Sequence, residues 1–285
     1  MTFNEWALGH EPVVRLSAFF GMFALMGVWE ALAPRRLRLL PRRARWPHNV
    51  ALVVLNSLIL RLAFPVAAVG FALLAAERGW GLLNAFSVPF WWAFALSVIA
   101  LDLAIYLQHV MFHAVPQLWR LHRVHHADLD FDVTTGARFH PIEIVISMGI
   151  KLMVVTTLGA PALAVLIFEL MLNATAMFNH SNVSIPETLD RLLRRIVVTP
   201  DMHRVHHSVI PKETNSNFSF NLPWWDHLFG TYAAQPRDGH TDMVVGIEQF
   251  RKAQDLRLDQ MLIQPFLGNA GDYPINRTGD GSHGD

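Results

Sequence analysis

Long apolar segments separated by short polar stretches make up the N-terminal part of the chain. Residues 13–33 (VVRLSAFFGMFALMGVWEALA) carry charges only near their two ends, and their length matches the roughly 20 residues with which a helix crosses a bilayer. Residues 49–76 and 88–106 are also long and apolar, with Arg61 and Asp102 as their only charged residues. We therefore predict three membrane-spanning helices here. The first should be retained, because Glu5 and Glu11 precede it and it lacks the basic start of a signal peptide.

Two shorter apolar stretches follow, at residues 142–158 and 161–178, with the breaker Gly-Ala-Pro between them. At about 1.5 Å per helical residue each reaches only about 25 Å, so they form either two thin spans or a re-entrant hairpin. Both alternatives return the chain to the side that it left. The pattern predicts an all-α membrane bundle with four to five membrane helices.

An arginine-rich loop indicates the orientation of this bundle. Residues 34–47 (PRRLRLLPRRARWP) contain six arginines, whereas residues 1–12 and 77–87 together contain only Arg78. The positive-inside rule places the arginine loop in the cytoplasm and the N-terminus outside. By parity, everything after residue 179 is predicted to be cytoplasmic.

Composition supports a membrane protein and narrows its chemistry. Charged residues make up 16% of the chain, below the roughly 25% of a usual soluble domain. The formal net charge is zero, which gives no reason to expect a nucleic-acid partner. With no cysteine, disulfides, thiolate zinc sites and iron–sulfur clusters are excluded. We predict a single membrane-embedded domain over residues 1–268 and a disordered Gly-rich and polar tail over residues 269–285.

Histidines are the most unusual feature of the sequence, because ten of the fifteen fall between residues 109 and 207. The segment HVMFH (109–113) and the two HRVHH segments (122–126 and 203–207) each place their histidines on one helix face. One zinc or iron ion takes three or four protein ligands. We therefore predict a two-metal cap with nine candidate ligands: His109, His113, His122, His125, His126, His180, His203, His206 and His207.

Imidazole suits zinc, copper, nickel and iron alike, so spacing does not identify the metal. The HExxH pattern of zinc metalloproteases is absent, which argues against a zinc-dependent membrane hydrolase. A non-catalytic metal binder or transporter is the alternative from another class, although it predicts ligands at several depths of the membrane. The simplest alternative is that the histidines are solvated residues at the membrane surface.

Seven motifs in order along the chain resemble the fatty acid hydroxylase/sterol desaturase superfamily, including its alkylglycerol monooxygenase branch. They are HVMFH, LHRVHH, FDVTTGARFHPIE, FNHSN, TPDMHRVHH, NSNFSFNLPWWDHLFGTY and GIEQFR, between about residues 102 and 250. The resemblance implies a membrane-bound non-haem diiron oxygenase that hydroxylates or desaturates a lipid or sterol-like substrate with O₂. It implies that the nine histidines hold two iron ions, for which zinc could substitute.

Four further residues are candidate catalytic residues. Asp102 lies about two helical turns before His109, where a carboxylate inside a membrane helix is either functional or hydrogen-bonded to a neighbouring helix. The resemblance places His140 beside the ligands or on the substrate side. Asp128 and Glu143 could accept hydrogen bonds from ligand imidazoles, since metal-bound histidines generally donate their other N–H. Asp128 could also compensate the charge of the metals.

No haem, flavin or iron–sulfur motif is visible in the sequence. Electrons are therefore expected from an external donor, either a separate reductase or, as the resemblance implies, a reduced pterin. Arg61 lies inside the second predicted span, and a salt bridge to Asp102 or Glu169 would account for it. The substrate, the carbon attacked and the choice between hydroxylation and desaturation stay open.

Overall fold

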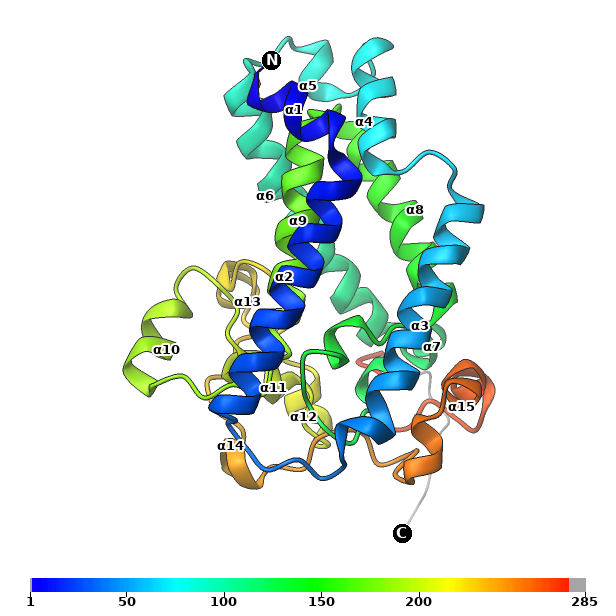
Figure 1. Ribbon diagram of the computed structural model, residues 1–285, viewed down its shortest axis with the longest axis vertical. Coiled ribbons are helices and arrows are strands. Elements are labelled where there is room, and N and C mark those ends of the chain that lie inside the picture. The colour runs from blue at the N-terminus through cyan, green and yellow to red at the C-terminus, as the bar shows by residue number, and fades with distance from the viewer. Residues whose placement is uncertain (1, 277–285) are drawn as a thin grey trace.

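The computed structural model describes residues 2–276, and its regular secondary structure is helical throughout that range (Figure 1). This confirms the all-α prediction. The long helices are α2 (Glu11–Leu32), α3 (Arg42–Ala63), α6 (Phe90–Ala114), α8 (Pro141–Leu158) and α9 (Ala162–Asn179). The shorter ones are α1 (Phe3–Gly9), α4 (Ala68–Glu77), α5 (Leu82–Ala85), α7 (Pro116–His126), α10 (Glu187–Leu193), α11 (Pro200–His206), α12 (Pro211–Thr214), α13 (Trp224–Phe229), α14 (Gly239–Asp242) and α15 (Leu258–Ile263).

Within residues 2–276, five helical segments are long and apolar enough to cross a membrane: α2, the run Arg42–Ala85, α6, α8 and α9. The predicted multi-pass bundle is confirmed, but two boundaries differ. The second span starts at Arg42 and is interrupted after Ala63, where Pro65 cannot donate a backbone hydrogen bond. The third span continues to Ala114, so the first two ligand candidates lie on the membrane helix itself.

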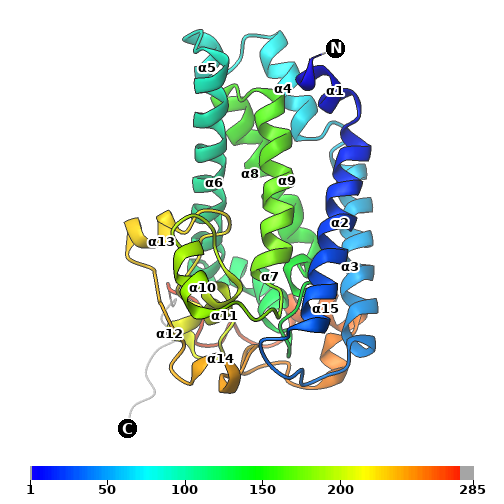
Figure 2. The same ribbon diagram turned by 60° about the vertical axis from the view of Figure 1, so that its left-hand side comes forward.

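Helices α8 and α9 form a hairpin that runs alongside α6 (Figure 2). Each contains 18 residues, about 27 Å at 1.5 Å per residue. Gly159 ends α8 with a positive φ of 69°, and an added Cβ there would lie 2.6 Å from the Trp80 carbonyl oxygen. The tight turn returns the chain to the end of the bundle opposite the N-terminus, where α7 and α11 also lie (Figure 2).

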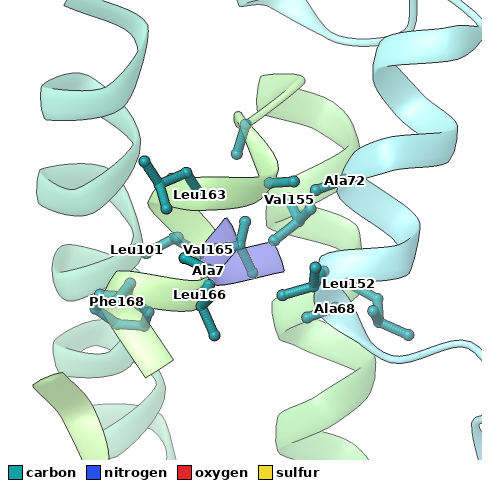
Figure 3. Close-up of a cluster of buried hydrophobic side chains, with 13 residues drawn as sticks. Ala7, Ala68, Ala72, Leu101, Leu152, Val155, Leu163, Val165, Leu166 and Phe168 are labelled. Carbon is teal, nitrogen blue, oxygen red and sulfur yellow. The ribbon is translucent and has the colours of Figure 1, made fainter. Parts of the chain in front are cut away.

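The bundle packs around a cluster of buried apolar side chains from α4, α6, α8 and α9 (Figure 3). Leu101, Val155 and Phe168 meet there, and Ala68 and Ala72 let α4 approach closely. Small residues of this kind serve helix association in lipid, where tight packing rather than the hydrophobic effect holds helices together. Large apolar side chains on the outer surface of the long helices remain exposed, among them Phe20, Leu58, Trp91 and Leu96.

The C-terminal segment corrects one prediction. Residues 269–276, which we expect to be disordered, pack against the histidine end of the bundle. Tyr273 is buried and its ring stacks on Trp119, with ring centroids 5.3 Å apart. Backbone N–H groups of Ile275 and Asn276 donate to carbonyls at the end of α6. The packing of Tyr273 on buried Trp119 orders this segment despite its polar composition. The rest of the predicted tail, residues 277–285, lies outside the described residues.

Candidate metal centre

Four segments bring the nine candidate ligands together at one end of the bundle. His109 and His113 lie on the last turns of α6, and α7 contributes the second set after starting at Pro116. Helix α11 starts at Pro200, where the Thr199 hydroxyl accepts from the Met202 N–H, and it contributes the last set. His180 caps the C-terminal end of α9. All nine imidazoles are buried.

The nine imidazoles form two groups. Within each group, the ligand atoms all lie within 4.8 Å of one another. Group A contains five histidines: His109, His113, His122, His126 and His206. Group B contains four: His125, His180, His203 and His207. In each HxxHH segment the i and i+4 histidines share a group and the i+3 histidine belongs to the other, because residues four apart stack on nearly the same helix face. The two segments contribute in opposite ways. The i and i+4 histidines of the first HxxHH segment belong to group A, and those of the second belong to group B.

Protein acceptors fix the outer ring nitrogen of most group A histidines. His109 Nδ1 donates to the Phe218 carbonyl at 2.7 Å, and His206 Nδ1 donates to the Ser216 carbonyl at 2.7 Å. His113 Nδ1 lies 3.1 Å from Asn215 Oδ1, and His122 Nδ1 lies 2.7 Å from Glu143 Oε1. In group B, His180 Nδ1 donates to the Ala176 carbonyl at 2.8 Å. Such bonds select the tautomer whose Nε2 lone pair is free to bind a metal.

Many ring nitrogens of the two groups have no hydrogen-bond donor or acceptor beside them. Because Nδ1 carries the proton in both His109 and His122, their Nε2 atoms face each other at 3.1 Å as two lone pairs. Eight other ring nitrogens, on His113, His125, His126, His203, His206 and His207, have no hydrogen-bond partner within residues 2–276. Buried polar atoms are rarely left unsatisfied. Cations between the rings would bind one nitrogen of each ring, so the donor set fits two imidazole-bound metal ions.

Electrostatics favour the ligand form of these side chains. Burial lowers the pKa of His122 to about 3 and that of His180 to about 3. Burial, reinforced by neighbouring histidines, also lowers the pKa of the remaining α7 and α11 ligands well below the ordinary value: His125, His126, His203, His206 and His207. The rings are therefore neutral near pH 7, which is the form that binds metals.

Glu143 lies where the sequence places it, against a ligand imidazole. Its Oε1 accepts from His122, its buried Oε2 has no partner among the described residues, and the residue lines a cavity of about 450 Å³. The same cavity reaches His109 and His122 of group A. His140 is in neither histidine group. Its Nδ1 accepts from the Ile142 N–H at the start of α8, and its Nε2 contacts the Leu262 carbonyl at 3.2 Å.

Asp102 contacts no histidine of the two groups and instead binds residues 221–225, at the end of a loop and the start of α13. It accepts hydrogen bonds from the Asn221 side chain at 2.7 Å and the Trp225 indole at 2.8 Å. The suggested salt bridges of Arg61 are wrong. Arg61 is exposed, and Glu169 instead pairs with Arg15 at 2.5 Å and Lys151 at 2.7 Å.

Asp128 contacts an arginine instead of an imidazole, which corrects its predicted hydrogen bond to a ligand. Fully buried Arg45 donates two bonds of 2.7 Å to Asp128 and one of 2.6 Å to Asp132. Burial alone would raise the pKa of Asp128, but the charges of Arg45 and Arg138 lower it to about 2. We missed Arg45 by treating it only as part of the orientation signal. The acidic repeat DLDFD beside the second histidine set was the available clue.

The segment Asn215–Asn221 is a second feature that we missed. It supplies the carbonyls and the amide oxygen that bind His109, His113 and His206. Buried Asp226 holds it by accepting the backbone N–H groups of Phe218 and Ser219 at 2.8 and 3.0 Å. Backbone acceptors leave no trace in residue types, so only the motif NSNFSFNLPWWDHLFGTY could have indicated this role.

Comparison with known proteins now identifies the region that carries the histidines. Residues 94–231 match the family model for fatty acid hydroxylase, which confirms the predicted resemblance. Ornithine lipid hydroxylase OlsE of Rhizobium tropici is 31% identical over 148 residues, or 52% of this chain and 44% of that protein. Alkylglycerol monooxygenase of Xenopus tropicalis is 30% identical over 50% of this chain and 31% of its own length. The human alkylglycerol monooxygenase is 28% identical over 55% and 34%.

The chain therefore spans less than half the length of these curated relatives. No solved structure matches it.

Proposed function

We propose, with residues 94–231 forming a fatty acid hydroxylase domain, that this protein is a membrane-bound non-haem diiron oxygenase. It would insert oxygen into, or desaturate, an unactivated C–H position of a lipid or sterol-like substrate, using O₂ and electrons from outside the chain. Relatives named as a lipid hydroxylase and as alkylglycerol monooxygenases support this assignment.

The observation that carries the proposal is the pair of buried histidine groups, each of which offers one ring nitrogen per histidine within 4.8 Å of the others in its group. When bound, two iron ions would supply the activation of O₂ and the removal of hydrogen from carbon. Group A would hold one ion and group B the other, with zinc as a possible substitute. All nine ligands lie at one end of the bundle (Figure 2), which disfavours an ion relay across the membrane.

The chain's own residues would orient the ligands and exclude water. Glu143 holds a proton on His122 Nδ1, so that Nε2 keeps its lone pair for the ion. Phe139 stacks on His125, with ring centroids 4.4 Å apart, and Trp119 packs against His113 at 4.8 Å. These rings close the site to solvent, which strengthens every electrostatic interaction within it.

The remaining candidate residues take positioning roles in this proposal. Asp102 fixes the end of the ligand-binding segment Asn215–Asn221 through Asn221, and Asp128 fixes the turn after α7 through Arg45. His140 sets the start of α8, three residues before Glu143. None of the three contacts the cavity that reaches group A, so their loss should act through the histidines.

We further propose that the histidine end and the C-terminus face the cytoplasm and that the N-terminus lies outside. The six arginines of residues 34–47 support this sidedness. An external donor, a reductase or a reduced pterin, would then deliver electrons from the cytoplasmic side.

The test is metal analysis of the purified protein followed by lipid turnover under labelled O₂ with a chemical reductant. We expect about two iron ions per chain and one labelled oxygen atom in the product, or loss of two hydrogens. Equal turnover in anaerobic buffer, with oxygen drawn from water, would identify a hydrolase and refute the proposal.

A further inference from the structure

Helix α8 carries a polar stripe along a membrane-spanning helix. Glu143, Ser147 and Lys151 are spaced i, i+4 and i+8 and line one cavity of about 450 Å³, the cavity that reaches His109 and His122. Eight residues of helix cover about 12 Å. Polar side chains at this depth are costly in a membrane and mark a functional path. The stripe therefore leads from group A toward the middle of the bundle.

Three acceptor atoms around this cavity have no hydrogen-bond partner within residues 2–276: Asn56 Oδ1, Gln108 Oε1 and Glu143 Oε2. Asn56 is 7% exposed and Glu143 is 3% exposed. The orientation of the Asn56 amide is fixed, because its Nδ2 donates to the Phe139 carbonyl at 2.8 Å and a carbonyl can only accept. Gln108 Nε2 donates to Ser147 Oγ at 2.9 Å, which leaves its Oε1 free. In this arrangement all three free atoms are acceptors and need hydrogen-bond donors.

The charged residues further along the stripe do not supply those donors. Lys151 Nζ binds Glu169 Oε1 at 2.7 Å, and Arg15 bridges Glu169 and Glu11. Two cations and two carboxylates make this cluster electrically neutral, so it offers no net attraction for an anion. The unpartnered acceptor atoms of the cavity therefore need hydrogen-bond donors from a bound ligand, close to the histidines.

A second, apolar cavity of about 590 Å³ adjoins the first between α2, α3 and α9. The two share the lining residues Phe19, Val53, Ser57, Ala137 and Asn173. Five of its lining residues are exposed apolar side chains of α2 and α3: Leu16, Phe20, Val50, Val54 and Leu58. A hydrocarbon chain could therefore enter here directly from the bilayer.

We propose that the substrate binds head first: a headgroup bearing hydrogen-bond donors, hydroxyl or ammonium, lies against Asn56, Gln108 and Glu143, and its hydrocarbon chain occupies the apolar cavity. This deepens the proposed oxygenase function and rests on it. It places the oxidised carbon in the headgroup or close to it, and not at the far end of the chain.

Competitive lipid binding to the full chain, kept anaerobic to prevent turnover, tests the proposal by native mass spectrometry. A monoalkyl glycerol competes with the same lipid methylated on both hydroxyls, and lysophosphatidylethanolamine competes with lysophosphatidylcholine. We expect about tenfold preference for the donor-bearing member of at least one pair, as one lost buried hydrogen bond predicts. The pair that discriminates identifies hydroxyl or ammonium as the donor. Equal binding within both pairs overturns the proposal.

Variants locate the preference. Gln108→Met and Asn56→Leu should each reduce it to about twofold or less. Ser57→Ala is the matched control, because Ser57 lines both cavities but its hydroxyl already donates to the Val53 carbonyl. Metal content and thermal unfolding of each variant confirm folding, and Gln108→Met leaves the Phe139 carbonyl bond intact. A preference that survives in both folded variants overturns the assignment.

The two proposals fail differently. Preferred binding of a donor-bearing lipid without any O₂-dependent product supports the headgroup site and refutes the oxygenase. Oxygenation of lipids with no headgroup preference supports the oxygenase and refutes head-first binding.

Discussion

Group A and group B are built from the same residue type but differ in what surrounds them. In group A, four of the five outer nitrogens meet a protein acceptor: a carboxylate, an amide oxygen or one of two backbone carbonyls. In group B only His180 does, through the Ala176 carbonyl. Group A also lines a cavity through His109 and His122, whereas the group B histidines line neither of the two described cavities.

This difference indicates that the two groups have different roles. A histidine that lines a cavity has no side chain packed against it on the cavity side. Hydrogen bonds from its Nδ1 to protein acceptors can fix its orientation instead. Group B is held by ring packing instead, with Phe139 stacked on His125 and Phe131 against His207 at 5.1 Å. We infer that a substrate would approach the histidines of group A, which line the cavity, and not those of group B.

Removing one ligand from each group should have the largest effect. His206→Ala in group A and His203→Ala in group B leave four and three ligands, so each variant should bind the ion of the altered group more weakly and retain fewer than two ions per chain after treatment with a chelator. Lipid oxidation should fall to background in both variants, because the proposed reaction would need both ions. Elemental analysis and product assays measure the two quantities. His48→Ala, outside both groups, is the control, and retention of both ions in His206→Ala would contradict the ligand assignment.

Removing the carboxylate should weaken group A alone. Glu143→Ala leaves His122 Nδ1 without its acceptor, and loss of such a partner costs about ten- to hundredfold in metal affinity. Titration with a competing chelator should show one weakened and one unchanged site. Glu143→Gln keeps an oxygen for His122 and should weaken binding less. Equal weakening of both sites would mean that the groups do not act separately.

A glycine gives the corresponding test of group B. An added Cβ at Gly136 would lie 2.6 Å from the Ala176 carbonyl oxygen and 3.1 Å from His180 Nδ1. Gly136→Ala should therefore displace the His180 anchor and destabilise the protein by about 1–3 kcal/mol, as overpacking does. Thermal unfolding and chelator titration measure this. Gly149→Ala, where a Cβ meets nothing within 4 Å, is the control. A Gly136→Ala protein with two intact sites would show that α9 adjusts freely.

The grouping of the histidines illustrates what sequence can predict. The apolar segments predicted the spans, since length and composition determine which helices suit a membrane. The spacing of His122, His125 and His126 placed them on one face, and the same periodicity separates His125 from the other two. Which helix contributes to which group depends on the angles at which α6, α7 and α11 meet, and these angles have no signal in the sequence.

The supporting contacts were harder to predict because they join distant parts of the chain. Arg45 precedes its partner Asp128 by 83 residues, and either residue alone has many possible uses. The carbonyls of Ser216 and Phe218 are invisible in a sequence, because every residue has a carbonyl. Glu143 was predictable, because it follows the second histidine set in a recognised motif. It lies in the first turn of α8, next to His122.

Lowering the pH should produce the smallest difference between the two groups. His122 of group A and His180 of group B have the same pKa of about 3, and burial is the main cause in both. In the unfolded chain each would titrate near 6.5. The folded state therefore binds fewer protons between about pH 6.5 and 3, and its stability falls as the pH is lowered through that window. Protonation of the unfolded ligands removes metal at the same time. We expect both ions to be released in a single step that coincides with unfolding, followed by circular dichroism and a metal-sensitive dye. Release of one ion at a higher pH, with the helices intact, would show that one group is open to protons in the folded state and that the shared burial does not protect both.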